Sequence, residues 1–245
     1  MKMIKAGIKN EITKLFNLKK YKMLLIVIGI LGFSSNILGA ITQGSIIISF
    51  INSPFIILTI LTEFILPLII AMAAADLFTA EQENGAIKAV ITRPISRIEI
   101  FISKVLAIIL YIILSLFICL VISLISSITF DGIGSVNIIE AFIAYVVSIA
   151  PMIPIVFFAV TVSQMCKNSS STVMIFVLGY IVIVAAFTII PGINPMIFTS
   201  YTGWYKLFIG EVMPAGKILN VLTLLASYTL ILFAISSWAF EKREY

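Results

Sequence analysis

The sequence predicts an all-α membrane protein with six transmembrane helices. Two observations carry this prediction: 61% of the 245 residues are hydrophobic, and the mean hydropathy is +1.20. Only 11% of the residues are charged, whereas a soluble domain carries roughly a quarter. A soluble protein with a large core is therefore excluded, because the chain lacks the charge to cover such a core with a polar surface.

The positions of the apolar runs predict the spans. A bilayer core takes about 20 apolar residues per helix. Runs of suitable length lie near residues 23–43, 54–78, 100–128, 139–165, 172–190 and 218–239. Together they predict a single six-helix transmembrane domain over residues 23–245. Pro67 predicts a kink in the second span, and Pro151 and Pro154 predict kinks in the fourth.

Residues 1–22 predict an amphipathic helix that lies in the membrane interface. Ile4, Ile8, Ile12 and Leu15 recur at helical spacing, while most of the lysines in this segment lie off that stripe. The alternative is a basic flank that only fixes the topology of the chain.

The basic residues predict the orientation. Fourteen of the sixteen Lys and Arg residues fall on one side of the predicted membrane, and only Lys206 and Lys217 fall on the other. Because cytoplasmic loops are enriched in Lys and Arg, we expect both termini to be cytoplasmic, in a multi-pass protein of the cell membrane. Anionic lipid is the expected counterpart of this charge, and nucleic acid is not an expected partner.

One dense polar passage, "DLFTAEQENGAIKAVITRPISRIEIFISK" at residues 76–104, interrupts the apolar chain. Capping boxes at Thr79–Gln82 and Ser96–Glu99 predict two helix starts, and Pro94 ends the first helix before the third span begins. Gly85 weakens that short helix or marks its true beginning. The apolar residues between the boxes share one helical face: Ala86, Ile87, Val90 and Ile91. This pattern favours a short cytoplasmic helix that docks on a partner, and an ordinary solvated loop is the alternative.

The same passage resembles the cytoplasmic segment of ABC-2 type transporter permeases, especially those of bacitracin, antimicrobial-peptide and sodium exporters. The shared pattern is E-x-E-x-G, an apolar turn, and then R-P-I-S-R-x-E-I-F-I-S-K. It is matched here by Glu81, Glu83, Gly85, Arg93, Pro94, Ser96, Arg97 and Lys104. Chain length, six spans and the N-terminal helix also agree with the ABC-2 exporter fold.

The resemblance implies a non-catalytic permease subunit of an ABC exporter, with ATP and Mg²⁺ bound by a separate ATP-binding cassette subunit. The sequence contains no G-x-x-x-x-G-K-[ST] loop, so ATP hydrolysis must reside on that partner. The family's coupling helix implies coupling roles for Glu81, Glu83, Gly85, Ile87, Val90, Arg93, Pro94 and Arg97. Two permease subunits, alike or different, would assemble with two ATPase subunits, and this chain itself is expected to bind no cofactor or metal.

A peptide antibiotic or another amphipathic molecule is the substrate class that the resemblance suggests. Sodium or ion efflux is an alternative, as is a membrane immunity or assembly factor without turnover of its own. A membrane-embedded enzyme is not expected, because the chain has no histidine and its spans contain neither paired acids nor a serine–lysine constellation.

Two further regions are candidates for a role in transport. Glu63 is an ionisable residue inside the second span, where such a group is by default a functional-site candidate. The alternative is a snorkelling or hydrogen-bonded carboxyl group. The loop before the last span carries several aromatic residues, among them Trp204 and Tyr205. These residues fit either an aromatic anchor at the outer membrane interface or a re-entrant segment that gates the outer end of a pathway.

Overall fold

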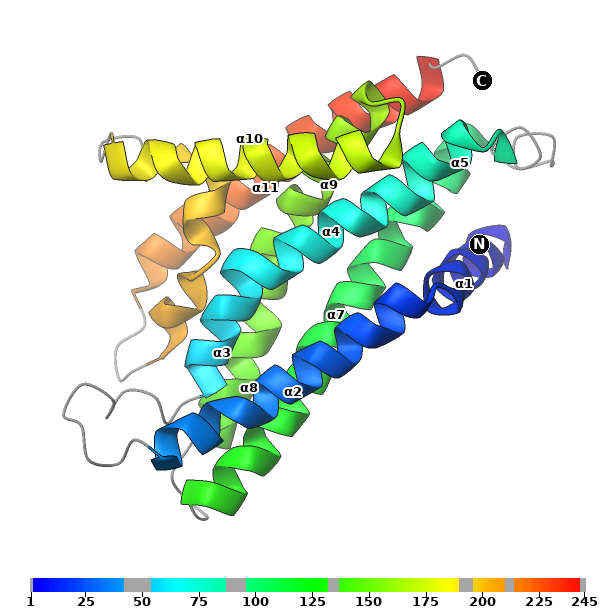
Figure 1. Ribbon diagram of the computed structural model, residues 1–245. Helices are drawn as coiled ribbons and strands as arrows, with labels where there is room; N and C mark the ends of the chain where they lie inside the picture. The colour runs from blue at the N-terminus through cyan, green and yellow to red at the C-terminus, as the bar shows by residue number, and fades with distance from the viewer. Residues whose placement is uncertain are drawn as a thin grey trace.

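The computed structural model describes residues 2–41, 54–86, 96–131, 137–189, 196–209 and 214–242. Every regular element within these ranges is helical (Figure 1), which confirms the all-α class. Four residues of the predicted coupling segment lie outside the described ranges: Ile87, Val90, Arg93 and Pro94.

The first half of the chain forms α1 (Lys2–Asn17), α2 (Lys19–Ile41) and one long interrupted helix. The long helix consists of α3 (Pro54–Ile60), the π-helical turn η2 (Leu61–Ile65), α4 (Leu66–Ala74), a second π-helical turn η3 (Ala75–Thr79) and α5 (Ala80–Glu83). The second half contains α7 (Arg97–Asp131), α8 (Ile138–Val147), α9 (Ile149–Met165), α10 (Ser169–Ile189) and α11 (Ala215–Lys242). Two short 3₁₀ helices, η5 (Phe198–Tyr201) and η6 (Trp204–Phe208), precede α11.

Within the described residues, five helical stretches are long and apolar enough to cross a membrane. They are Pro54–Glu83, Arg97–Thr129, Ile138–Met165, Ser169–Ala186 and Ala215–Lys242. In addition, α2 covers most of the first predicted span at 23–43. The second span is longer than predicted, because its helix continues five residues beyond position 78.

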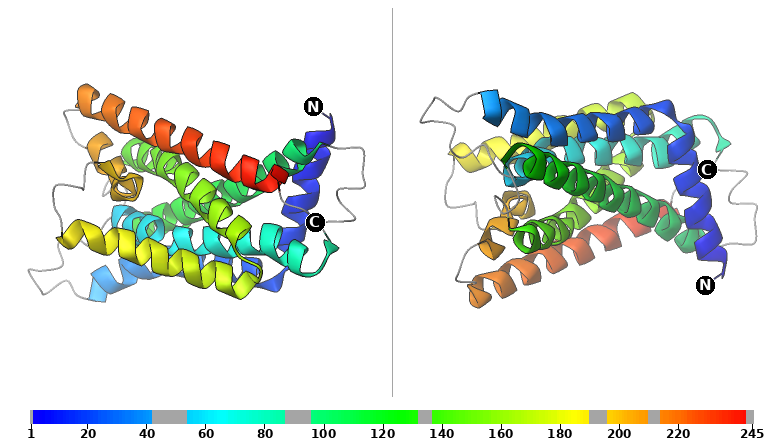
Figure 2. Two further views of the ribbon diagram at one scale, coloured as in Figure 1. Left: turned by 90° about the horizontal axis from the view of Figure 1, so that it is seen from above. Right: turned by 90° about the horizontal axis from the view of Figure 1, so that it is seen from below.

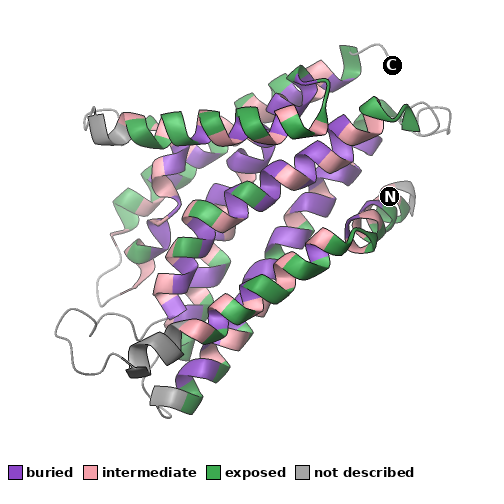
Figure 3. Cartoon of the chain, in the orientation of Figure 1, coloured by how far each residue is buried: buried purple, intermediate pink, exposed green. Residues whose placement is uncertain are grey.

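The bundle has a packed interior and two exposed margins. In the apolar stretch of α8–α9, 61% of the residues are buried. In the apolar stretches of α10 and α11 only 11% of the residues are buried (Figure 3). Helix α1 crosses the ends of the other helices at a steep angle, and both ends of the chain lie at that same end of the bundle (Figure 2).

Helix α1 packs its apolar face on α7. Leu15 is fully buried, and the Phe16 ring lies 6.1 Å from the Tyr111 ring, measured between centroids. A Cβ at Gly7 would lie only 2.6 Å from Ser103 Oγ, so the absence of a side chain lets α1 approach α7 this closely. The stripe that predicts an interfacial helix is therefore covered in part by protein.

Pro67 interrupts the second span as predicted, through the π-helical turn that precedes it. Proline has no N–H, so in α-helical register the carbonyl of Glu63 would lose its backbone donor. The Tyr180 hydroxyl of α10 donates to this carbonyl oxygen at 3.1 Å. A side chain from another helix thus satisfies the carbonyl that the proline leaves without its usual partner.

Pro151 has the same effect in the fourth span, which is interrupted at Ser148 between α8 and α9. The carbonyl four residues before this proline belongs to Val147, and the Trp204 indole N–H donates to it at 3.0 Å. Both prolines therefore create binding positions for distant aromatic side chains.

One of the two predicted helix starts is correct. At Ser96, the side chain accepts from the Glu99 N–H at 3.3 Å, while the Glu99 carboxylate accepts from the Ser96 N–H at 3.1 Å. The capping box predicted at Thr79 is wrong, because the helix runs without a break through this residue. Gly85, at φ +66°, lies in the turn between the end of α5 at Glu83 and the helical residue Ala86.

We predict that Tyr180→Phe lowers the free energy of unfolding by about 1 kcal/mol, because the Glu63 carbonyl loses its side-chain donor. Thermal unfolding in detergent would measure the change. In a Pro67→Ala background, Tyr180→Phe should lower the free energy of unfolding by less, because the substituted residue offers a backbone N–H to the Glu63 carbonyl. An equal cost in both backgrounds would contradict this account of the Tyr180 hydroxyl.

Candidate functional site

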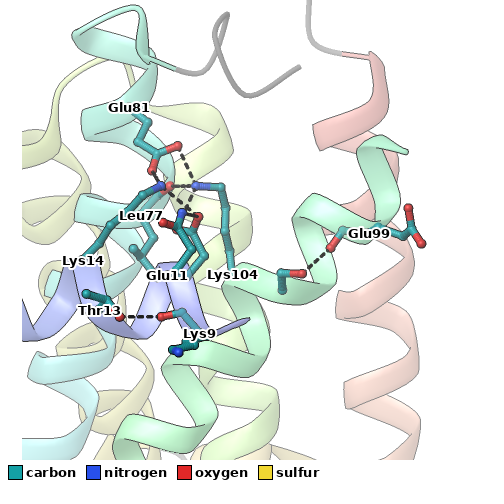
Figure 4. Close-up of polar contacts among 10 residues, drawn as sticks. Lys9, Glu11, Thr13, Lys14, Leu77, Glu81, Glu99 and Lys104 are labelled. Carbon is teal, nitrogen blue, oxygen red and sulfur yellow. Dashed lines mark hydrogen bonds and ion pairs between the residues drawn. The ribbon is translucent and has the colours of Figure 1, made fainter. Parts of the chain in front are cut away.

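The candidate functional site lies where α1, α5 and the beginning of α7 meet. Glu11 and Lys14 come from α1, Glu81 from α5 and Lys104 from α7 (Figure 4). We call these four residues the ion-pair cluster. Glu81 lies at the start of the predicted coupling segment and Lys104 lies beyond its end, so the cluster connects the two helices on either side of residues 84–96.

The four side chains form a closed ring of contacts. Glu81 accepts from Lys14 Nζ at 2.7 Å through one carboxylate oxygen and from Lys104 Nζ at 2.6 Å through the other. Glu11 lies 2.8 Å from the Lys14 ammonium and 3.5 Å from that of Lys104. The Leu77 carbonyl oxygen also accepts from Lys104 at 2.7 Å.

The four residues must occur together because the Lys104 ammonium group is buried and needs counter-charges. The Lys104 side chain is 0% exposed, and an isolated ammonium group at such a position would lose several kcal/mol of solvation free energy. Its three N–H donors are matched by three oxygen acceptors, from Leu77, Glu81 and Glu11. Two carboxylates and two ammonium groups also make the cluster neutral as a whole, which favours its burial.

The charge state of Lys14 follows from the same contacts. Burial lowers the pKa of this ammonium group, but hydrogen bonds to Glu11 and Glu81, and the negative charges of these residues, raise it by more. The pKa of Lys14 therefore lies above its ordinary value of 10.5. Lys14 is protonated at neutral pH, as the ion pairs require.

A second polar contact fixes the beginning of α2 next to this cluster. Asp76 accepts a hydrogen bond from the Tyr21 hydroxyl and forms an ion pair with Lys20 at 2.6 Å. The Tyr111 hydroxyl of α7 in turn donates to the Tyr21 carbonyl oxygen at 2.8 Å. The second span is thus joined to both N-terminal helices.

Glu83 connects the end of α5 to α10. Its carboxylate accepts from the backbone N–H and from the hydroxyl of Ser169, each at 3.2 Å. Ser169 begins α10, and a negative charge stabilises a helix at its N-terminus. Nearby, Thr79 contacts the Ser163 carbonyl at 3.1 Å and the Thr172 hydroxyl at 2.9 Å.

Arg97 makes the corresponding contact to α11. Its guanidinium group donates to the Glu241 carbonyl oxygen at 2.7 Å, close to the end of that helix. A positive charge suits a helix C-terminus as a negative charge suits an N-terminus. The structure therefore places Glu81, Glu83 and Arg97 at one end of the bundle, each bonded to a different helix. Their coupling role stays a prediction.

The loop before α11 turns into the bundle. The Tyr205 ring is buried and stacks on Phe55 at 6.4 Å between centroids, and its hydroxyl donates to the Phe55 carbonyl at 3.0 Å. Trp204 is buried as well, and its indole binds the Val147 carbonyl. Both rings pack against protein, and this arrangement disfavours the alternative of a simple aromatic anchor exposed to lipid.

Glu63 lies next to this loop. One of its carboxylate oxygens is 3.9 Å from the position that a Cβ would take on Gly203, and Lys206 Nζ is 3.7 Å from the same position. An acid of the second span and a base of the loop thus face the same glycine. Among the described residues, no group of three or more His, Cys, Asp or Glu is placed to hold a metal ion.

Sequence reasoning missed the partnership of Glu11 and Lys104, which lie 93 positions apart. Lys104 is counted among the basic residues that predict the topology, but the sequence does not indicate that its side chain is buried among acids. One signal was present: Glu11 is the only acid among seven lysines in residues 1–22.

We predict that Lys104→Met lowers the free energy of unfolding by about 3–5 kcal/mol, because it leaves buried carboxylates without a counter-charge. Denaturation in detergent would measure the loss. Lys217→Met removes an equal charge at an exposed position of α11 and serves as the matched control. The double variant Lys104→Met/Glu81→Gln should lose less unfolding free energy than the sum of the losses in the two single variants. Additive losses would show that Lys104 and Glu81 do not stabilise each other.

The raised pKa of Lys14 predicts a pH dependence. A base whose pKa is raised on folding contributes stability below its ordinary pKa and loses this contribution as the pH rises through the folded value. The difference in unfolding free energy between the wild type and Lys14→Met should therefore stay constant between pH 7 and pH 9. It should shrink above about pH 10.5. A difference that shrinks below pH 9 would contradict the assignment.

Comparison with known families identifies the family of this chain. The model of the family described as "ABC-2 family transporter protein" matches residues 3–245, which include every residue of the ion-pair cluster. No curated protein matches the chain. Because the family match extends over nearly the entire length, the chain belongs to the ABC-2 transporter family and is a multi-pass membrane permease.

Proposed function

We propose that this chain is the permease subunit of an ABC exporter that moves a peptide antibiotic or another amphipathic substrate across the cytoplasmic membrane. Permeases of this family work in general with an ABC ATPase and are generally its non-catalytic membrane component. The chain contains no phosphate-binding loop of its own. In the proposed assembly, two permease subunits join two ATPase subunits, which bind the ATP and Mg²⁺.

The ion-pair cluster is the observation that carries the proposal. Residues 84–96 connect α5 to α7, and Glu81 and Lys104 on these helices lie 2.6 Å apart. A force applied to the connecting segment would therefore reach two membrane helices at once. Through Lys14 and Glu11 it would also reach α1, and through Glu83 it would reach α10.

This arrangement suits the transmission of a conformational change. Short contacts between buried charges resist gradual deformation, so the connected helices tend to move together between discrete arrangements. Transport would then follow from ATP-dependent stabilisation of one helix arrangement over another. Glu81, Glu83, Gly85, Ile87, Val90, Arg93, Pro94 and Arg97 are the residues that we assign to this coupling.

Orientation is part of the proposal. Both chain ends lie at the same end of the bundle as α5 (Figure 1), and fourteen of the sixteen Lys and Arg residues occur in segments predicted for one side of the membrane. We place this end in the cytosol, where an ATPase subunit would meet it. At the opposite end, the buried rings of Trp204 and Tyr205 would close the outer end of a pathway and open it when the loop moves.

Glu63 favours an ion as a second candidate substrate. Its carboxylate lies in a helix that is apolar enough to span the membrane, close to Lys206 and to the buried outer loop. Carboxylates within membrane helices commonly mark ion or proton pathways. Glu63→Gln would abolish ion-dependent transport if this second function holds and would leave the export of a neutral amphipathic peptide largely intact.

The docking of an ATPase on the coupling segment can be tested by co-purification. We predict that the variant Ile87→Asp/Val90→Asp/Pro94→Ala no longer co-purifies with the candidate ATPase subunit and no longer stimulates its ATP hydrolysis. Carboxylates on an apolar docking face would remain unpaired in the interface.

The matched control is Ile138→Asp/Ile139→Asp, which adds the same charge to exposed residues at the beginning of α8, near the other end of the bundle. This control should retain both association and ATPase stimulation. Wild-type association in the triple variant would overturn the docking role.

A further inference from the structure

The exposed face of α2 combines positive charge with an aliphatic surface. Lys19 and Lys22 are exposed at the beginning of the helix. Met23, Ile26 and Ile30 follow on the same side and are 64%, 62% and 61% exposed. At 100° per residue these five side chains fall within one face. The opposite side holds the buried Tyr21 and Ile28 and packs on α7.

The structure separates the N-terminal lysines into two groups. Lys14 and Lys20 form ion pairs with acids of the second span. Four others are exposed and have no ion pair with any acid in the described parts of the chain: Lys5, Lys9, Lys19 and Lys22. The acids close to these helices are already used, since Glu11 and Glu81 bind Lys14 and Lys104, and Asp76 binds Lys20. The unpaired lysines therefore leave a net positive charge.

We propose that this face of α2 binds an anionic phospholipid. Its phosphate group would contact Lys19 and Lys22, and one acyl chain would lie along Met23, Ile26 and Ile30. The apolar face extends from Met23 to Phe33, which is about 15 Å at 1.5 Å per residue. This length equals roughly one leaflet of a 30 Å hydrocarbon core. Both the charge and the dimensions of a phospholipid therefore fit.

Pairing of this α2 face with the same face of a second copy is unfavourable. Two copies with the same membrane orientation that paired in this way would be related by an axis along the membrane normal, so equivalent depths would meet. Lys19 and Lys22 of one copy would then lie against the same residues of the other, and like charges repel. The inference requires only that the chain lies in a membrane. It does not depend on an ATPase partner, so each of the two proposals can fail without the other.

The test compares two lipids that have the same acyl chains. The full chain in a non-ionic detergent is titrated with phosphatidylglycerol or phosphatidylcholine, and native mass spectrometry counts the bound lipid. The wild type should prefer phosphatidylglycerol. Each lysine near an anionic lipid surface contributes roughly fivefold to affinity, so Lys19→Gln/Lys22→Gln should weaken phosphatidylglycerol binding by at least about tenfold. Binding of phosphatidylcholine should stay unchanged.

Lys5→Gln/Lys9→Gln removes the same charge from exposed positions of α1 and is the matched control. It should weaken phosphatidylglycerol binding by less than about threefold. Equal losses in both double variants would overturn the site in favour of diffuse attraction, and so would the absence of a lipid preference in the wild type. Ile26→Cys tests the other occupant: rapid disulfide formation between two copies would show that a second chain covers this face.

Discussion

The fully buried ammonium group of Lys104 is the constraint on which one end of this molecule depends. A lysine at this position requires counter-charges within hydrogen-bonding distance. Glu81 can provide one only because its helix continues past the apolar run of the second span. Glu11 can provide the other only because α1 folds across the end of the bundle, where Gly7 permits a close approach. The path of three separate segments therefore follows from a single buried charge.

A related constraint acts on the backbone at the opposite end. In lipid, a carbonyl without a donor cannot bond to water, so another group of the protein must satisfy it. Pro67 and Pro151 each remove a backbone N–H donor from a helix. The Tyr180 hydroxyl and the Trp204 indole N–H donate hydrogen bonds to the two carbonyl oxygens that lose this donor. The second of these contacts draws the loop before α11 into the bundle. Prolines that interrupt two helices thereby also determine where a distant loop lies.

The two ends of the bundle consequently use polarity in different ways. At the end with both termini, acids and bases are paired across helices, and the surplus consists of exposed lysines. At the other end, hydroxyl and indole groups satisfy backbone oxygens, and Glu63 and Lys206 face one glycine without a direct ion pair among the described residues. Strong buried pairs suit the transmission of force that we propose for one end. Weaker neutral hydrogen bonds suit the opening that we propose for the other.

The sequence alone determined the helical membrane class, the approximate spans, the interruptions near Pro67 and Pro151, and the helix start at Ser96, whereas α9 continues through Pro154. Composition and contacts within four residues decide these features, and both can be read along the chain. It also indicated the family, because the motif around residues 81–104 is local. Tertiary structure decided that Thr79 does not cap a helix, since its hydroxyl binds a carbonyl 84 positions away. It likewise decided that Lys104 is buried, because pairings across such separations depend on how helices pack.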